Sequence, residues 1–344
     1  MVEAICTEIA LRKDYLSNKK LSSIYFGGGT PSLLDESDLE KIFRSLSLHF
    51  DWDDHTEITL EANPDDISAG KLQMLKIWGI NRLSIGIQSF FDADLKWMNR
   101  AHDAKEAATS IQLSQDLGFE NITIDLIYGS PTTTSDMWAE NIRTALQFGI
   151  PHISSYCLTV EEKTALYHKV RTKKFTSPDP DLAAAQFDVL METLTESGYD
   201  HYEISNFGLP AHHATHNTNY WKGAHYAGIG PSAHSYDGTS RAWNIANNKK
   251  YIDSILMESL PQETEYLSAS TMYNEYIMTG LRTMWGVSLQ KLQSFGPIYL
   301  PYFIALIEPE IRKGHVLENN GIYTLTREGK HFADRIAMHL FYVD

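Results

Sequence analysis

Residues 23–32 read SIYFGGGTPS, a short apolar run that ends in three glycines, a threonine and a proline. The run of Ile24, Tyr25 and Phe26 is typical of a strand, and the glycines after it allow a tight turn or the close approach of a ligand. The stretch lacks the GK[ST] ending of a phosphate-binding loop and the GxGxxG spacing of a dinucleotide site. Taken alone, it leaves a structural turn and a ligand contact equally open.

Four later segments repeat this arrangement of an apolar strand that ends in polar residues or glycine. They are EITLEANP (57–64), NRLSIGIQS (81–89), NITIDLIYG (121–129) and HISSYCLT (152–159). A helical period of apolar residues follows each strand, with about 30–35 residues from one strand to the next. Strands that are apolar on both faces indicate a parallel sheet covered by helices, so we expect an α/β fold, either a (β/α) barrel or a doubly wound sheet. The chain opens on a helical segment, residues 2–16, so the first strand of the repeat is missing.

The polar residues gather at the carboxyl ends of these strands, where parallel α/β folds bind their ligands. The candidate positions are Gly27, Gly28, Gly29, Thr30, Pro31, Glu61, Gln88, Arg100, Asp125 and Thr159. An acid such as Glu61 or Asp125 at the end of an apolar strand is costly unless it is paired or bound to something. A structural ion pair or a helix cap therefore stays open for each acid, but five converging strand ends together predict a pocket.

Residues 199–245 interrupt the alternation of strands and helices. YDHYEISNFG (199–208) could be a further strand, and HHATHNTNYWKGAHYAGIGPSAHSYDG (212–238) is expected to be a functional loop without regular structure. His212, His213 and His216 have an H-x3-H spacing that could hold a metal if helical. A porphyrin-binding edge is at least as plausible, because imidazole is a usual axial ligand of haem iron. A loop fixed by hydrogen bonds remains the structural alternative.

The last part of the chain predicts a small appended domain. Three helical segments are followed by HVLENNGIYTLT (315–326), a hairpin with an NNG turn, and by a final helix. This order predicts a winged-helix-like domain, and the mixed charges nearby favour packing or interaction over DNA binding. We therefore divide the chain into residues 1–205, a connecting segment 206–265 and residues 266–344.

Composition narrows the class of function. The 344 residues include 29 basic and 44 acidic side chains, a formal net charge of −15, which argues against a nucleic-acid partner or an anionic membrane surface. No window approaches the ~20 apolar residues of a membrane span, and the first residues do not form a secretory signal, so we expect a cytoplasmic protein. Cys6 and Cys157 form no CxxC pair, and we expect both to be small core residues.

Several segments, taken together, carry a family resemblance. They are SIYFGGGTPSLL, ITLEANP, NRLSIGIQSF, NITIDLIYGSP, YEISNFG, HNTNYW and GIGPSAHSY. In this order they resemble the oxygen-independent coproporphyrinogen III oxidase family of radical S-adenosylmethionine (SAM) proteins, over nearly the whole chain. HNTNYW (216–221) is similar to the HNxxYW motif of that family's HemW haem chaperones, which the true oxidases lack.

The resemblance implies a partial (β/α)6 TIM-like barrel lacking its first strand here, a C-terminal helical domain, a 4Fe–4S cluster and SAM. It assigns Gly27–Pro31, Glu61, Gln88, Arg100 and Asp125 to the SAM pocket, with Thr159 a weaker match. It also assigns haem binding to the HNTNYW region, through His216, Asn217, Tyr220 and Trp221. Haem and haem-acceptor proteins are the implied partners, and a homodimer is possible.

One family feature has no counterpart. The family ligates its cluster through a CxxxCxxC motif after the first strand, whereas this chain has two cysteines, neither in that position. Either the chain begins at an internal methionine, which its helical opening favours, or the protein has lost the cluster.

Two functions follow as hypotheses. The first, which we favour, is a haem chaperone that binds haem and delivers it to haem-requiring proteins. The second is an oxidase that removes two propionate carboxylates of coproporphyrinogen III, with a radical formed from SAM. Whether the chain is an enzyme therefore stays open at this point.

Overall fold

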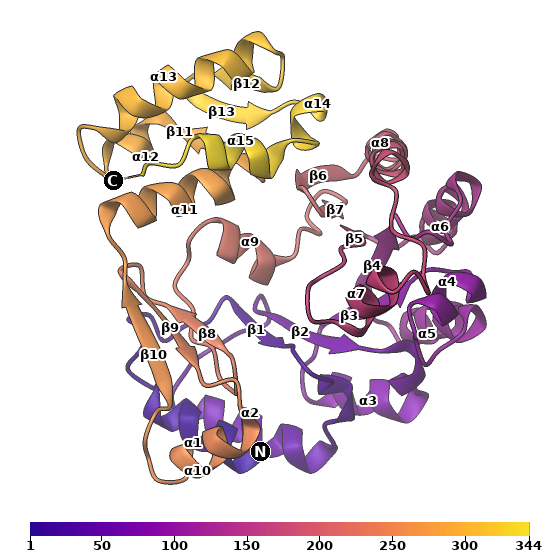
Figure 1. The fold of residues 1–344 in the computed structure, drawn as a ribbon. Helices are drawn as coiled ribbons and strands as arrows, with labels where there is room; N and C mark the ends of the chain where they lie inside the picture. The colour runs from indigo at the N-terminus through magenta and orange to yellow at the C-terminus, as the bar shows by residue number, and fades with distance from the viewer. Residues whose placement is uncertain (344) are drawn as a thin grey trace. The chain divides into compact units, whose positions relative to one another are not determined.

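The computed structural model describes residues 1–343, and at residue 165 it describes the backbone alone (Figure 1). The chain divides into two compact units, each assembled from separate stretches of sequence. One unit contains Met1–Ile24, Leu34–Glu57 and the chain from Thr215 onward, and the other contains Tyr25–Leu33 and Ile58–Ala214. Both units are therefore discontinuous in sequence.

The three sequence ranges proposed above, 1–205, 206–265 and 266–344, stay a prediction. Grouping residues in space does not test which segments of the chain fold on their own.

A seven-stranded sheet, in the order β1-β2-β3-β4-β5-β7-β6, is the framework of the α/β part. The strands are β1 (Ser23–Phe26), β2 (Glu57–Ala62), β3 (Arg82–Gln88), β4 (Asn121–Tyr128), β5 (His152–Cys157), β6 (Asp200–Glu203) and β7 (Asn206–Gly208). Neighbours from β2 to β5 pair in parallel. Ile85 and Ile124, in the middle of this run, are completely buried, as expected for a sheet covered on both faces. The sheet curls into an open half-barrel, which confirms the predicted α/β fold and decides for the barrel over the doubly wound alternative.

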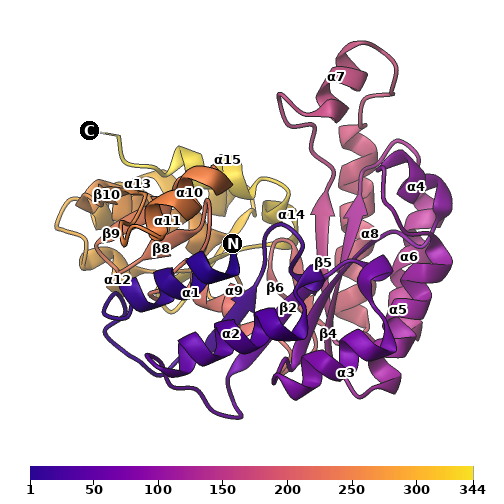
Figure 2. The same ribbon diagram turned by 90° about the horizontal axis from the view of Figure 1, so that it is seen from below.

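Helices connect the parallel strands, and α3, α5, α6 and α8 lie along the outer side of the sheet (Figures 1 and 2). The connecting helices are α2 (Glu36–Ser47), α3 (Ala69–Ile77), α4 (Asp92–Trp97), α5 (Ala104–Asp116), α6 (Ser135–Gln147), α7 (Ala165–Arg171) and α8 (Pro180–Glu196). Short 3-10 turns, Pro31–Leu33 and Pro64–Asp66, follow β1 and β2. Two of the helices begin with a capping box, from Asp35 to Asp38 in α2 and from Asp103 to Glu106 in α5. These side chains satisfy the backbone amides that the first turn of a helix leaves without a partner.

The segment after α8 differs from the expectation. Residues 199–208 form a hairpin of two short strands, β6 and β7, and β7 pairs antiparallel with both β5 and β6. The glycine and proline of Gly208–Pro210 end the hairpin. Residues 212–238 are not structureless, because they contain a helix, α9 (Thr215–Trp221), and a strand, β8 (His234–Tyr236). Sequence analysis missed this helix because its seven residues show no apolar period.

The unit that contains both the first helix and the C-terminal part adds two small sheets, in the orders β10-β9-β8 and β11-β13-β12. Its remaining elements are α1 (Val2–Leu11), β9 (Ser240–Asn244), α10 (Asn248–Ile255), β10 (Gln262–Tyr266), α11 (Ala269–Leu281), β11 (Val287–Ser288), α12 (Leu289–Gln293), α13 (Tyr299–Arg312), β12 (Val316–Asn319), β13 (Ile322–Leu325), α14 (Arg327–Lys330) and α15 (Ala333–His339). From α11 onward the order of helix, strand, two helices and hairpin is the predicted winged-helix-like arrangement.

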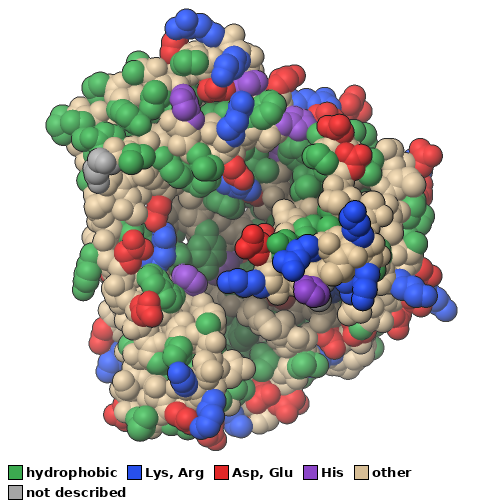
Figure 3. Space-filling model, in the orientation of Figure 1, with side chains coloured by type: hydrophobic (Ala, Val, Ile, Leu, Met, Phe, Trp, Pro, Cys, Tyr) green, Lys and Arg blue, Asp and Glu red, His purple; other side chains and the backbone are tan. Residues whose placement is uncertain are grey.

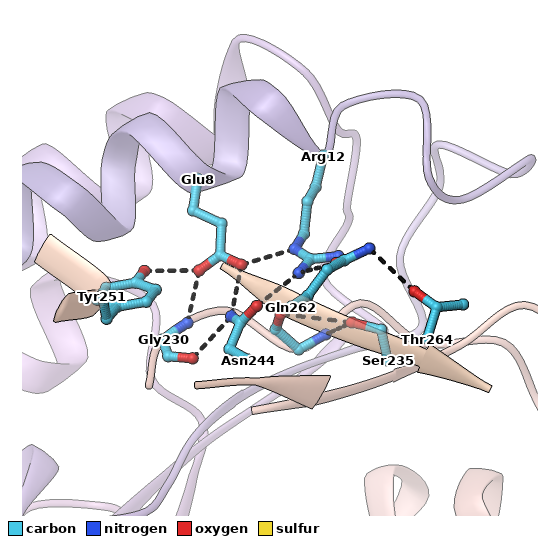
Figure 4. Close-up of polar contacts among 9 residues, drawn as sticks. Glu8, Arg12, Gly230, Ser235, Asn244, Tyr251, Gln262 and Thr264 are labelled. Carbon is cyan, nitrogen blue, oxygen red and sulfur yellow. Dashed lines mark hydrogen bonds and ion pairs between the residues drawn. The ribbon is translucent and has the colours of Figure 1, made fainter. Parts of the chain in front are cut away.

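A buried ion pair joins α1 to distant parts of the same unit (Figure 4). Glu8 is completely buried, and its carboxylate accepts hydrogen bonds from Arg12 Nε (2.7 Å), Asn244 Nδ2 (2.7 Å), Gly230 N (2.8 Å) and Tyr251 Oη (2.6 Å). Arg12 is 2% exposed and also donates to the side-chain oxygens of Asn244 and Gln262. The charges of both partners are thus buried and hydrogen-bonded, as a stable buried pair requires.

The surface carries charges of both signs. On the face drawn in Figure 3, Lys and Arg side chains are interspersed with Asp and Glu side chains. The net negative charge is therefore spread out on this face rather than gathered in one patch. Within residues 1–343, none of the helices has the length and apolar character needed to cross a bilayer.

Candidate functional site

The strand-end residues predicted from sequence lie in the unit formed by Tyr25–Leu33 and Ile58–Ala214, which we call the barrel unit. They are placed on five different strands or on the loops after them. Gly27–Pro31 follow β1, Glu61 lies in β2, Gln88 ends β3, Asp125 lies in β4 and Thr159 follows β5. Arg100 comes from the loop between α4 and α5.

Glu61 connects the sheet to residues Gly27–Pro31, the glycine loop, through hydrogen bonds. Its Oε1 accepts a hydrogen bond from Tyr25 Oη (2.8 Å), and its Oε2 accepts one from the backbone N–H of Gly28 (3.0 Å). Gly28 and Gly29 have φ of 72° and 64°, in the left-handed region that favours glycine. An added Cβ would touch no atom within 4 Å at either position, so the exposed loop leaves its backbone open to a ligand.

A second polar cluster lies at the end of β3. It consists of Gly86 and Gln88 on the strand and of the Arg100 side chain, which contacts them. Arg100 Nη2 donates to Asn63 Oδ1 (3.0 Å) and to the carbonyl oxygen of Gly86 (3.3 Å). A Cβ on Gly86 would lie 3.2 Å from both Arg100 Nη2 and Gln88 Nε2, so a side chain there would crowd them. Gln88 Oε1 and Arg100 Nε are buried and lack a hydrogen-bond partner among the described residues. Buried polar atoms without partners are rare, so this set suits a polar ligand.

Asp125 has an unusual environment. Its pKa is raised to about 7, mainly by burial and next by the charge of Glu61, while the charges of Arg82 and Arg100 act in the opposite direction. Burial also raises the pKa of Tyr25, whose hydroxyl bonds Glu61. Glu61 is thus close enough to Asp125 for its charge to raise the pKa of the Asp125 carboxyl group.

Thr159 does not join these contacts. It is exposed beyond the end of β5, and none of the hydrogen bonds described for the other strand-end residues involves it. The structure brings the glycine loop together with Glu61, and Gln88 together with Arg100, but it leaves the weakest sequence candidate apart.

The HNTNYW segment forms α9, in the unit that contains α1 and the C-terminal part. His216, Asn217 and Trp221 are partly buried, and Tyr220 is 42% exposed. The rings of His216 and Tyr220, which lie one helical turn apart on α9, pack edge to face with 4.9 Å between their centroids. This edge-to-face geometry is favourable for aromatic pairs.

Neighbouring elements fix α9 at several points. Glu57, which opens β2, accepts hydrogen bonds from the backbone amides of Thr215 (2.7 Å) and His216 (2.9 Å). Ser23 Oγ is 2.9 Å from His216 Nδ1, and Asn219 Nδ2 donates to Ser22 Oγ at 3.0 Å. A seven-residue helix is too short to be stable alone, so these contacts hold it in place.

Aromatic rings and cations surround the end of α9. Tyr220 packs against Tyr226 at 4.4 Å between ring centroids. The guanidinium of Arg282 lies 5.5 Å from the ring centre of Trp221, and Lys222 Nζ lies 4.2 Å from that of Trp285. This surface combines flat apolar rings with two cations, of which Arg282 also forms an ion pair with Asp334 at 2.8 Å.

The H-x3-H hypothesis for a metal is not supported. His212 and His213 precede α9, and His213 Nε2 pairs with Asp200 Oδ2 at 3.0 Å. Across the described part of the chain, no group of three or more His, Cys, Asp or Glu side chains could hold a metal ion.

A 4Fe–4S cluster does not fit the residues of this chain. The two cysteines of the chain lie on α1 and β5, and the sequence contains no CxxxCxxC motif. The expectation that both are core residues was wrong for Cys157, which is exposed, while Cys6 is partly buried. Strand residues near a sheet's carboxyl edge can be apolar in sequence and still open to solvent. We therefore derive no chemistry that passes through a cluster.

Sequence analysis missed several residues that shape both sites. Arg82 is 1% exposed in β3 and donates hydrogen bonds to Thr59 and Thr123. Glu57 is 7% exposed, and Ser23 bonds the imidazole of His216. The argument applied to Glu61, that an acid in an apolar strand needs a partner, would also have selected Glu57. No sequence signal distinguishes Ser23 from other serines.

Comparisons with known proteins bear on both sites. A model of the radical SAM superfamily matches residues 6–145. The haem chaperone HemW of Bacillus subtilis is 34% identical over 313 residues, which cover 90% of this chain and 83% of that protein. The haem chaperone HemW of Lactococcus lactis is 35% identical over 298 residues, covering 85% of this chain and 78% of that protein.

Among solved structures, coproporphyrinogen III oxidase (HemN) from Escherichia coli, described as a radical SAM enzyme, has a similar fold. Its TM-score is 0.83 at 22% identity, and the match covers 98% of this chain and 82% of that one. At this identity the likeness concerns the fold alone.

Proposed function

Because the chain belongs to the HemW haem chaperone family of radical SAM proteins, we propose that it binds haem through α9 and delivers it to proteins that require haem. The observation that carries the proposal is the histidine of an anchored helix: His216 sits on α9, and its ring is packed edge to face on Tyr220. Imidazole is a usual ligand of haem iron, and neighbouring aromatic rings suit the flat macrocycle.

The charges near α9 support the same proposal. Haem carries two propionate carboxylates, and Lys222 and Arg282 place cations beside Trp285 and Trp221. Carboxylate groups bind such cations through charge-assisted hydrogen bonds. Asn217, Tyr220 and Trp221 complete the proposed haem contacts.

We propose separately that the strand-end residues of the barrel unit bind SAM. The glycine loop offers open backbone, and Gln88 and Arg100 offer buried polar atoms. Glu61 and Asp125 add negative charge, which suits the positively charged sulfonium and amino groups of SAM. Thr159 remains a weaker candidate.

An optical haem titration tests the chaperone proposal. The wild-type chain should bind haem saturably with a shifted Soret band, and His216→Ala should weaken binding at least about tenfold, which corresponds to about 1.4 kcal/mol. His55→Ala, an exposed histidine in the same unit, is the matched control and should bind like the wild type. Equal affinity of the His216→Ala variant would show that this imidazole is not the haem ligand.

The oxidase hypothesis makes a different prediction. If the chain decarboxylated coproporphyrinogen III, anaerobic incubation with SAM and a reductant would release carbon dioxide and form vinyl groups. We expect no such product from this chain. The relatives with 34% and 35% identity are haem chaperones, whereas the likeness to the oxidase is one of fold.

A further inference from the structure

We propose that Ser23 is a positioning residue for the haem ligand: its hydroxyl holds Nδ1 of His216 and thereby selects Nε2 as the nitrogen that binds iron. The proposal rests on the haem-binding function proposed above and deepens it. It concerns an interaction between residues 193 positions apart in sequence, on the first strand and on α9.

The geometry of the pair supports this role. Ser23 opens β1, so its backbone belongs to the sheet rather than to the helix that it contacts. Its Oγ lies 2.9 Å from His216 Nδ1 in a partly buried environment. At this distance the two atoms are within ordinary hydrogen-bonding range, and partial burial limits the competition from water.

The backbone of His216 is held by a different residue. Glu57 accepts hydrogen bonds from the amides of Thr215 and His216, and Asn219 donates to Ser22. These contacts fix the position of α9. The His216 ring itself contacts the Ser23 hydroxyl through Nδ1 and the ring of Tyr220 edge to face, and we assign the orientation of Nδ1 to the Ser23 contact.

The chemistry of imidazole explains the consequence. A neutral imidazole has one protonated nitrogen and one lone pair, and the partner of one nitrogen decides which atom can bind a metal. When Nε2 binds iron, Nδ1 carries the hydrogen, and the Ser23 hydroxyl oxygen accepts it. Metal-binding histidines usually have such a partner on the second nitrogen, and removing it typically lowers metal affinity about 10–100-fold.

The neutral hydroxyl also has an electronic effect. A carboxylate at this place would pull the Nδ1 proton more strongly and make the imidazole a stronger donor to iron. The structure therefore predicts that Ser23→Asp lowers the reduction potential of bound haem relative to the wild type.

The test compares four variants. Ser23→Ala removes the partner, and Ser23→Thr keeps the hydroxyl. Ser17→Ala, at an exposed serine of the same unit, is the matched control, and His216→Ala removes the ligand. Haem affinity is measured by titration, and the ligand field by electron paramagnetic resonance of ferric haem. We expect Ser23→Ala to weaken haem binding about 10–100-fold and change the resonance spectrum. Ser23→Thr should restore both, and Ser17→Ala should leave both unchanged.

A second measurement needs no haem. Nitrogen-15 chemical shifts of His216 in the free protein report which ring nitrogen carries the hydrogen. The wild type should carry the hydrogen on Nδ1, and Ser23→Ala should give a mixture of the two tautomers. A wild-type imidazole with its hydrogen on Nε2 would refute the role of Ser23. Ser23→Thr, which keeps the hydroxyl, should hold the wild-type tautomer, so the comparison reports on the hydroxyl and not on haem affinity.

The outcomes separate the two proposals. If Ser23→Ala keeps the wild-type affinity, spectrum and tautomer while His216→Ala loses haem, the role of Ser23 is refuted and the haem site stands. If His216→Ala binds haem as well as the wild type, the proposed function itself fails.

Discussion

Replacing Glu8 by alanine tests whether the buried ion pair of α1 stabilises the fold. The change removes the acceptor for four hydrogen bonds, from Arg12, Asn244, Gly230 and Tyr251. It also leaves the Arg12 guanidinium, 2% exposed, without its counter-charge.

The expected loss of folding free energy can be worked out from the interactions that the Glu8→Ala substitution removes. Removing one partner of a buried pair typically costs 3–5 kcal/mol, and each buried donor left without an acceptor adds to the cost in a non-additive way. We expect Glu8→Ala to lower the free energy of unfolding by about 4 kcal/mol. At a denaturant dependence of about 3 kcal/mol per molar urea, the unfolding midpoint of this unit would fall by ~1.3 M.

Urea unfolding followed by circular dichroism measures this change. Glu3→Ala, an exposed acid on the same helix, is the matched control and should change stability by less than about 1 kcal/mol. The double variant Glu8→Leu with Arg12→Met should be less destabilised than Glu8→Ala, because it no longer buries an isolated charge. A loss below about 1 kcal/mol for Glu8→Ala would refute the argument that this network stabilises the unit.

Two further predictions concern the barrel unit. Gly28→Val should weaken SAM binding about tenfold or more, because a branched residue at a φ of 72° costs about 1–2 kcal/mol and its side chain occupies open space beside the loop. Calorimetric titration with SAM measures this, and wild-type affinity in the variant would contradict it. Asp125→Asn should stabilise the protein above pH 7 and match the wild type near pH 4, as measured by urea midpoints at several pH values. The sign follows because the pKa of Asp125 is raised from 3.8 to about 7 on folding, so the folded state binds more protons and wild-type stability falls as pH rises between these values. A pH-independent difference between the two proteins would refute it.

The alternation of strands and helices could be predicted because it depends on local periodicity. Each of the strands β1 to β5 was expected from an apolar run with a polar or glycine ending, and the parallel order follows from the helices between them. The hairpin of β6 and β7 was not predicted, because the sequence NFG gives no sign of its antiparallel partner. Helix α9 was missed because its stability comes from Glu57 and Ser22, which are distant in sequence.

The residues of the candidate sites also divide into those that the sequence could predict and those that it could not. The strand-end positions could be chosen from sequence because the carboxyl ends of parallel strands meet at one edge. The partners of those residues could not be chosen: Tyr25 and Asn63 bind Glu61 and Arg100 through side-chain geometry that only the folded chain defines. Ser23 and Arg82 belong to the same class.

The ion pair of α1 also has a consequence for the order of events during synthesis. Glu8 emerges from the ribosome before Asn244, which donates to its carboxylate and lies 236 residues later. At the usual 5–20 residues per second, the first helix waits roughly 12 to 47 s for that partner. Throughout this interval Glu8 and Arg12 can satisfy only each other, and water must solvate the rest. Closure of this network is therefore a late step in synthesis, and nascent chains that stall before residue 244 leave the Glu8 carboxylate without the partner that Asn244 provides in the finished protein.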